Sequence, residues 1–337
     1  MGHLVETPGR LSYACPQDPR WAPCTRYPDS HADFPMRRKF PTRTSAHRAF
    51  PLAIALGGFI GCRPQDRPES NAADQTTPGT AGPAAVTLTA TDYAFGFPDT
   101  VVAGWTTFHL VNHGSRPHMA QLIRLESGMT VEQFLEAYGE AFRSKGPRPE
   151  WARRLGGPTV TAPHATSNAT LELGPGNYLW ICLYNLPDGV PHVVGHGMAE
   201  AFVVQPASGT EPARAAPEAD IVMRLLDYSF SLSAPLAAGR HTIRVENAGT
   251  ESHEVSVTRL AAGKTIEDLR AWLRNPGERL PDSVGSVAGG VTSLAPGAEA
   301  YFEVDLTPGE YLLLCFVTAP DGRSHIDHGM IQQIKVS

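Results

Sequence analysis

The second half of this chain repeats the first. A four-residue motif, Asp-Tyr-x-Phe, begins at Asp92 and again at Asp227, a displacement of 135 positions. Further pairs follow in the same order in both halves: Asn112 and Asn247, Gly114 and Gly249, His118 and His253, Cys182 and Cys315, His192 and His325, Met198 and Met330. Self-similarity at a nearly fixed distance indicates two copies of one structural unit. We therefore expect a tandem duplication.

Strand patterns dominate each copy. Apolar and polar residues alternate in two stretches and are almost all apolar in two others; these are 106–112, 241–247, 177–183 and 311–317. Such patterns are typical of half-buried and fully buried strands. Thr130 and Thr265 each precede an amphipathic segment and are expected to cap a helix. The sequence predicts an all-β fold of two tandem Greek-key β-sandwich domains, each with a short helical insertion.

Composition divides the chain into six segments. They are an upstream extension, mis-started or disordered (1–35), a signal peptide (36–61), a flexible tether (62–84), domain 1 (85–205), an Ala/Pro-rich linker (206–218) and domain 2 (219–337). Two Gly-Gly pairs, at 156–157 and 289–290, are expected to mark turns.

The signal segment carries positive residues before a short apolar stretch, the order of a secretory signal. Its last residues, Phe59-Ile60-Gly61, lead into Cys62 and resemble a bacterial lipobox. This resemblance implies lipidation of Cys62 and a protein tethered to the periplasmic side of a bacterial membrane. A disordered extension with a chance apolar patch is the alternative. No apolar run reaches the roughly 18 residues of a membrane-spanning helix.

The charge of the chain argues against a polyanionic partner. The formal net charge is -6, and no basic run in the second half could neutralise a row of phosphates, so nucleic acid is not expected as a partner. Removal of the Arg-rich signal segment makes the remaining chain more acidic. An acidic protein attracts a basic partner surface, and salt weakens this attraction.

Metal-ligating residue types recur in one order in both copies: His, Cys, His, Met. This order resembles the cupredoxin (blue-copper-like) family, in which two imidazoles, a thiolate and a thioether hold one copper ion. Soft sulfur and imidazole together suit both oxidation states of copper. The resemblance implies one or two copper ions, with the ligands His118, Cys182, His192 and Met198 in copy one and His253, Cys315, His325 and Met330 in copy two. His196 and His328 are alternative ligands, and a metal-free protein remains an open alternative.

Other interpretations of the same residues stay open. A cysteine at the end of an apolar strand is often a buried small hydrophobe, and Cys182 could form a disulfide with Cys315. The loops between Cys and the second His are longer than in small blue-copper proteins. A Pro-Asp-Gly triplet in each loop, at 187–189 and 320–322, is expected to form a tight turn that accommodates this length.

The resemblance implies an electron-transfer protein in which electrons enter through His192 and His325. The partner would be a redox protein or a membrane electron-transport complex. Neither cysteine has a neighbouring histidine, which the resemblance requires for a route to a second copper site, so we expect no enzyme. Two alternatives are a copper-free structural subunit docked on a reaction centre or respiratory complex, and copper storage, which the lack of Met-rich or His-rich tracts disfavours.

Overall fold

A computed structural model describes residues 81–209, 214–275, 277 and 279–337. The predicted signal segment, Cys62 and most of the predicted tether lie outside these residues. Strand β1 (Ala84–Thr91) begins at the last residue of the predicted tether, and Ala81 pairs with Arg214 of the predicted linker. None of the described helices is long and apolar enough to cross a membrane.

The first repeat is built from nine strands and two helices. Its further elements are β2 (Ala94–Gly96), β3 (Thr100–Val102), β4 (Gly104–Asn112), β5 (Gln121–Leu125), α1 (Val131–Ser144), β6 (Ala152–Arg154), β7 (Thr166–Leu173), β8 (Gly176–Ile181), α2 (His192–Gly195) and β9 (Ala199–Gln205). Strands β3, β9, β8, β5 and β6 form one sheet. Phe108 of β4 meets Trp180 of β8 with ring centroids 4.9 Å apart, so a second sheet covers the first as a sandwich.

The second repeat has the same plan with eight strands and one helix. These elements are β10 (Ile221–Leu226), β11 (Ser229–Leu232), β12 (Gly239–Asn247), β13 (His253–Leu260), α3 (Ile266–Leu273), β14 (Gly285–Leu294), β15 (Glu299–Leu306), β16 (Gly309–Leu314) and β17 (Ile331–Val336). Strands β14, β13, β16 and β17 form its own sheet. The all-β sandwich prediction is confirmed, and the apolar runs around 177–183 and 311–317 become the buried strands β8 and β16.

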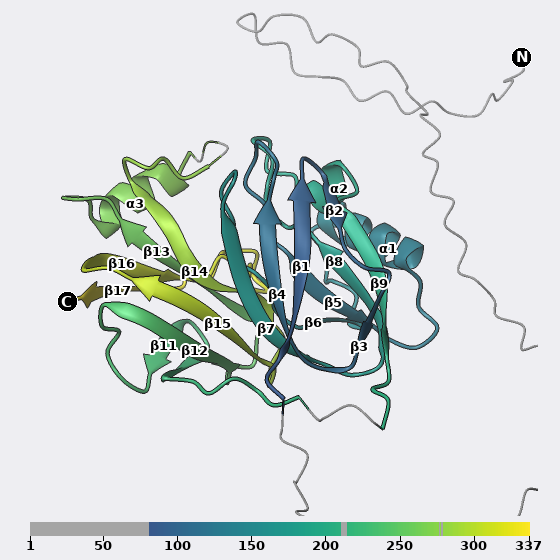
Figure 1. The fold of residues 1–337 in the computed structure, drawn as a ribbon. Coiled ribbons are helices and arrows are strands. Elements are labelled where there is room, and N and C mark those ends of the chain that lie inside the picture. The colour runs from purple at the N-terminus through teal and green to yellow at the C-terminus, as the bar shows by residue number, and fades with distance from the viewer. Residues whose placement is uncertain (1–80, 210–213, 276, 278) are drawn as a thin grey trace, which may run out of the picture. The chain divides into compact units, whose positions relative to one another are not determined.

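One eight-stranded sheet runs through both repeats in the order β11-β10-β12-β15-β7-β4-β1-β2 (Figure 1). The two halves meet where β7 pairs with β15. There the Asn168 side chain acts as a bridge, because its Nδ2 donates to the Glu303 carbonyl at 2.9 Å and its Oδ1 accepts from the Glu303 amide at 2.7 Å. The two repeats therefore share one sheet. The predicted domain boundaries at 205/206 and 218/219 stay predictions.

Both predicted helix starts are confirmed. Thr130 accepts a hydrogen bond from the Gln133 amide at 3.2 Å, and Gln133 returns one to the Thr130 amide at 2.9 Å. At the start of α3, the amide and hydroxyl of Thr265 both donate to the Asp268 carboxylate. Such reciprocal capping satisfies amides that the first turn of a helix leaves without partners.

The Gly-Gly pairs are not turns, and that prediction is wrong. Gly289 and Gly290 lie inside β14, where a β-carbon on Gly290 would stand 2.0 Å from the Val255 carbonyl oxygen. A β-carbon on Gly157 would stand 2.1 Å from the Ala120 carbonyl oxygen. Both residues also have positive φ, at +133° and +139°. Glycine is needed here for the close approach of two backbones.

Candidate metal centre

The strand ends of the second repeat bring its ligands together. His253 is the first residue of β13, Cys315 directly follows β16, and His325 lies in the loop before β17. His253 Nδ1 lies 3.0 Å from His325 Nδ1, and Cys315 Sγ lies 3.4 Å from His325 Nδ1. All three ligand atoms fall within 4.8 Å of one another, and all three side chains are fully buried.

The first repeat forms the same cluster. His118 pairs with Thr161 just before β5, Cys182 follows β8, and His192 begins α2. Cys182 Sγ lies 3.5 Å from His192 Nδ1 and 3.8 Å from His118 Nδ1, and the two Nδ1 atoms are 3.2 Å apart. These three ligand atoms also lie within 4.8 Å of one another. The convergence that sequence order alone predicted is thus found twice.

Met198 and Met330 are completely buried and are held beside the clusters by their backbones. The Cys315 amide donates to the Met330 carbonyl at 3.3 Å, and the Met330 amide donates to the His325 carbonyl at 2.8 Å. The corresponding bonds in the first repeat measure 3.2 Å and 3.3 Å. A role of the thioether sulfur as a fourth ligand stays a prediction.

The long loops fold as expected. The Gly189 amide donates to the Leu186 carbonyl at 2.8 Å, and the Gly322 amide donates to the Ala319 carbonyl at 2.9 Å. Each bond closes a tight turn around the Pro-Asp-Gly triplet, and the glycines adopt positive φ (+82° and +85°). The extra loop length is therefore absorbed away from the ligands.

Asparagine side chains fix the loop that carries the first histidine of each site. Asn247 Nδ2 donates to the carbonyls of Glu251 and Leu294, both at 2.8 Å, while its Oδ1 accepts from the Gly249 amide. Asn112 makes the corresponding bonds to Arg116 and Thr161 and from Gly114. This explains why these residues recur in both halves, since they hold a ligand-bearing loop without touching the ligand atoms.

Carboxylates behind the histidines were missed by the sequence reasoning. Asp227 Oδ1 lies 2.8 Å from His253 Nε2, and Asp92 Oδ1 lies 3.6 Å from His118 Nε2. The hydrogen bond with His253 lowers the pKa of the Asp227 carboxyl. A carboxylate on Nε2 keeps the proton there and leaves Nδ1 free for a metal. The repeated Asp-Tyr motif was the available signal.

The second histidines lie beneath stacked aromatic rings. Tyr93 packs edge-on against His192 with centroids 5.1 Å apart, and exposed His196 stacks on Tyr93 at 3.6 Å. In the second repeat Tyr228 contacts His325 at 5.2 Å and His328 stacks on Tyr228 at 4.6 Å. His196 and His328, the alternative ligands, are therefore outside both clusters and cover them instead.

Burial sets the protonation of the donor atoms. It raises the pKa of the Cys182 thiol to about 12 and also raises that of the Cys315 thiol. Burial, followed by the neighbouring His118, lowers the pKa of His192 to about 4. At pH 7 the metal-free sites thus hold protonated thiols, and the imidazoles of His118, His192 and His325 are neutral, so metal binding must release the thiol proton.

The chemistry of the donors fits copper. Each site offers two imidazole nitrogens and one sulfur in a buried cluster, a set that suits Cu(I) and Cu(II) and disfavours hard cations. Both cysteines are free, so the alternative of a Cys182–Cys315 disulfide is excluded in this structure. One or two copper ions per chain fit the two clusters.

Comparisons with known proteins found solved structures only. No family model matches, and no curated protein matches. The chain is similar to dithionite-reduced auracyanin from Roseiflexus castenholzii, with 17% identity over 37% of this chain and 100% of that one, and a TM-score of 0.27. It is also similar to a blue copper oxidase from Nitrosomonas europaea, with 14% identity over 75% and 86% of the chains and a TM-score of 0.24. Likenesses this low assign no function.

The comparisons do not bear out the expectation that the chain is not an enzyme, because enzymes are among the matched structures. The matched structures include that oxidase and a Cu-containing nitrite reductase from Thermus scotoductus, the latter with 13% identity over 76% and 62% of the chains and a TM-score of 0.22. The expectation relied only on the residue types next to the two cysteines. The absence of a histidine beside Cys182 and Cys315 removes one route to a second copper, and it carries no information about catalysis by other groups.

Proposed function

We propose that both repeats hold copper and that the protein transfers single electrons. The observation that carries this proposal is the convergence of two histidine nitrogens and one cysteine sulfur in each repeat, within 4.8 Å and away from water. Bound copper would supply a one-electron Cu(II)/Cu(I) couple at a fixed position. Met198 and Met330, buried beside the clusters, would add axial thioethers.

The chain contributes rigidity to this function. The first histidine and the cysteine of each site lie at or next to strand ends, and the Asp227 carboxylate orients the His253 imidazole from behind. A donor set that is already assembled rearranges little when its charge changes. This lowers the cost of moving an electron in either direction.

Electrons would reach the sites through the stacked rings. His192 and His325 are only 1% and 0% exposed, so a partner cannot touch them directly. The ring pairs His196–Tyr93 and His328–Tyr228 bridge from the surface to these imidazoles. We assign electron entry to these pairs in place of the histidine ligands themselves.

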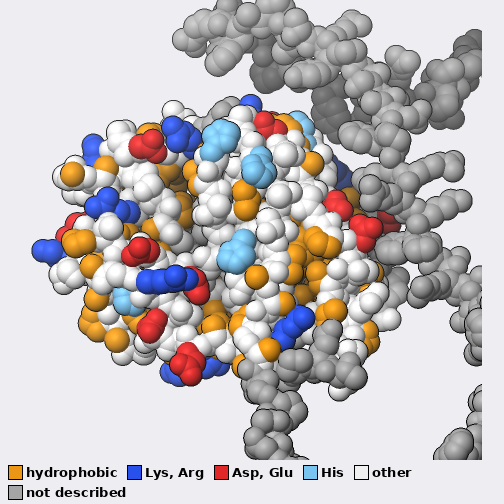
Figure 2. All heavy atoms as spheres, in the orientation of Figure 1, with side chains coloured by type: hydrophobic (Ala, Val, Ile, Leu, Met, Phe, Trp, Pro, Cys, Tyr) orange, Lys and Arg blue, Asp and Glu red, His pale blue; other side chains and the backbone are white. Residues whose placement is uncertain are grey.

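The partner and the membrane tether are further parts of the proposal. A lipid on Cys62 would hold the protein on the periplasmic side of a bacterial membrane, within reach of a redox protein or a membrane electron-transport complex. The face in Figure 2 carries interspersed positive and negative side chains. A basic partner would therefore bind another face or be attracted by the net negative charge of the whole molecule. Labelling with radioactive palmitate should mark the wild-type chain and not Cys62→Ala.

Metal reconstitution tests the proposal. Titration of the metal-free protein with Cu(II) should produce an intense visible thiolate-to-copper band that saturates at two ions per chain. One electron per copper from a mild reductant should bleach the band reversibly. Absence of both the band and bound metal would instead support a copper-free structural subunit of a larger redox assembly.

A further inference from the structure

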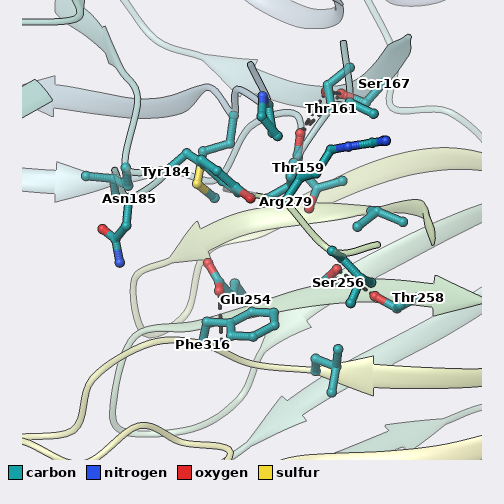
Figure 3. A pocket seen from close by; sticks show the side chains of 18 of the residues that line it. Thr159, Thr161, Ser167, Tyr184, Asn185, Glu254, Ser256, Thr258, Arg279 and Phe316 are labelled. Atoms are coloured by element: carbon teal, nitrogen blue, oxygen red, sulfur yellow. Dashed lines mark hydrogen bonds between the residues drawn. The ribbon is translucent and has the colours of Figure 1, made fainter. Parts of the chain in front are cut away.

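A cleft of about 530 Å³ lies between the two repeats. One wall comes from segments of the first repeat around residues 159–167 and 184–191, and the other from β13, β14 and the residues after β16. Figure 3 shows Thr161 and Ser167 on one side and Glu254, Ser256 and Phe316 on the other. A volume of this size is typical of sites for small organic molecules.

The cleft brings two arginines to one wall. Arg148 and Arg154 both line it. Arg148 Nη1 donates to the Tyr138 hydroxyl, and Glu254 attracts both arginines without forming a salt bridge to either among the described residues. Arg154 Nη1 donates to Ser293 Oγ at 3.3 Å, but its Nη2 is buried with no hydrogen-bond partner among the described residues. A buried donor without a partner is destabilising, so a ligand that accepts its hydrogen bond would be stabilised there.

The opposite wall offers an acceptor and an aromatic surface. Glu254 Oε1 accepts a hydrogen bond from the Phe316 amide at 3.0 Å, a bond drawn in Figure 3, and its other oxygen has no partner among the described residues. The Phe316 ring lines the cleft and is 41% exposed, unusual for a large apolar side chain in this molecule. Aromatic surface next to charged groups selects a flat molecule with a polar end.

The cleft is also adjacent to both candidate metal centres. Leu183 and Tyr184 follow Cys182, Phe316 and Val317 follow Cys315, and Glu254 follows His253; all of them line it. The Glu254 amide also donates to Cys315 Sγ at 3.4 Å. A molecule in the cleft would therefore contact residues that directly follow the cysteine ligands of both repeats in the sequence.

We propose that this cleft binds a small aromatic carboxylate whose carboxylate pairs with Arg154 and Arg148 and whose ring packs on Phe316. A hydroxyl on the far side of the ring would donate to Glu254. The proposal goes beyond copper-based electron transfer, because binding needs only the residues of the cleft and no metal.

Binding of 4-hydroxybenzoate to the metal-free full-length chain tests this proposal. Calorimetry should show one saturable site per chain. Arg154→Met should weaken binding at least tenfold, because it removes a charge-assisted hydrogen bond to the ligand carboxylate. Arg153→Met is the matched control, since this neighbouring arginine is exposed and does not line the cleft, and its binding should be unchanged.

Two further variants separate ligand contact from structural damage. Ser293→Ala removes the hydrogen bond that Arg154 Nη1 donates but keeps the Arg154 charge, so 4-hydroxybenzoate should still bind and Arg154→Met should weaken binding in this background too. Arg148→Met should weaken binding without touching that bond. The neutral 4-hydroxybenzamide should bind at least tenfold more weakly. No saturable binding of 4-hydroxybenzoate, or binding indifferent to both Arg154→Met and Arg148→Met, would overturn the proposal.

Discussion

The two candidate metal centres share their inner donors but differ in the charges behind them. In the second repeat both histidines meet a carboxylate: His253 Nε2 lies 2.8 Å from Asp227, and His325 Nε2 lies 3.1 Å from Glu251. In the first repeat Asp92 stands 3.6 Å from His118 Nε2, too far for a good hydrogen bond. That nitrogen has no hydrogen-bond partner among the described residues.

At the position of the first repeat that corresponds to Glu251, 135 residues earlier, the chain has the positively charged Arg116. Burial is the main cause that lowers the pKa of His118 and of His192, and Arg116 adds to both shifts. Negative charge near a ligand stabilises the more positive oxidation state of a metal, and positive charge disfavours it. The duplication thus kept the donor atoms and varied the charge around them. We therefore expect a lower reduction potential in the second repeat.

Removal of a thiolate should have the largest effect on this comparison. Cys315→Ser should abolish the visible copper band of the second site and leave that of the first, and Cys182→Ser should do the reverse. The reason is that serine offers a hard, weakly acidic oxygen in place of the soft sulfur. Absorption spectra of the singly substituted proteins then give each site separately. A band that survives in either variant at full intensity would contradict the assignment of that cysteine.

Removal of the Glu251 charge should bring the Cu(II) affinity and the reduction potential of the second site closer to those of the first. Glu251→Gln should weaken Cu(II) binding at the second site by about 10–100-fold, the usual cost of losing a partner behind a ligand, and should raise its potential. Competition with a copper chelator, in the Cys182→Ser background, measures this affinity. Glu267→Gln, an exposed residue of α3, is the control with the same loss of charge. Equal affinities in both variants would show that Glu251 does not tune the site.

Acid should destabilise the metal-free first site more than the second. The pKa of His192 falls from 6.5 to about 4 on folding, mainly through burial, so the unfolded chain binds more protons between these values. This contribution to stability is present above pH 6.5 and is lost as the pH falls towards 4. The pKa of His325 is also lowered by burial, but Glu251 opposes the shift.

Thermal unfolding of the metal-free protein between pH 7 and pH 4 measures this difference. His192→Gln should remove more of the pH dependence than His325→Gln, because the glutamine cannot be protonated. If His325→Gln removed as much or more, the account of the charges around the two sites would be wrong.

The hydroxyl of the tyrosine that covers each site should contribute to the free energy of unfolding mainly in the second repeat. Tyr228 donates to Glu251 Oε1 at 2.8 Å, whereas the Tyr93 hydroxyl makes no hydrogen bond to a described residue. Tyr228→Phe should therefore lower the free energy of unfolding, and Tyr93→Phe should lower it clearly less. Urea unfolding of the two metal-free variants provides the measurement, and equal losses would contradict the difference.

Sequence reasoning reached the inner donors because local patterns encode them. Strand periodicity located β8 and β16, and the order of ligand types placed Cys182 and Cys315 at their ends. The groups behind the ligands could not be read in this way, since the contact of Glu251 with His325 spans 74 positions and depends on how two loops pack. The Gly-Gly pairs misled for the same reason: the close approach that requires them exists only between folded strands.

X-ray absorption at the copper edge tests the central claim most directly. In protein loaded with two copper ions, the spectrum should show one sulfur and two imidazole nitrogens as the close ligands of the average copper, and the sulfur contribution should persist in both single Cys→Ser variants loaded with one ion. Copper surrounded only by nitrogen and oxygen would contradict the account, because the metal would then lie outside the two His-Cys-His clusters.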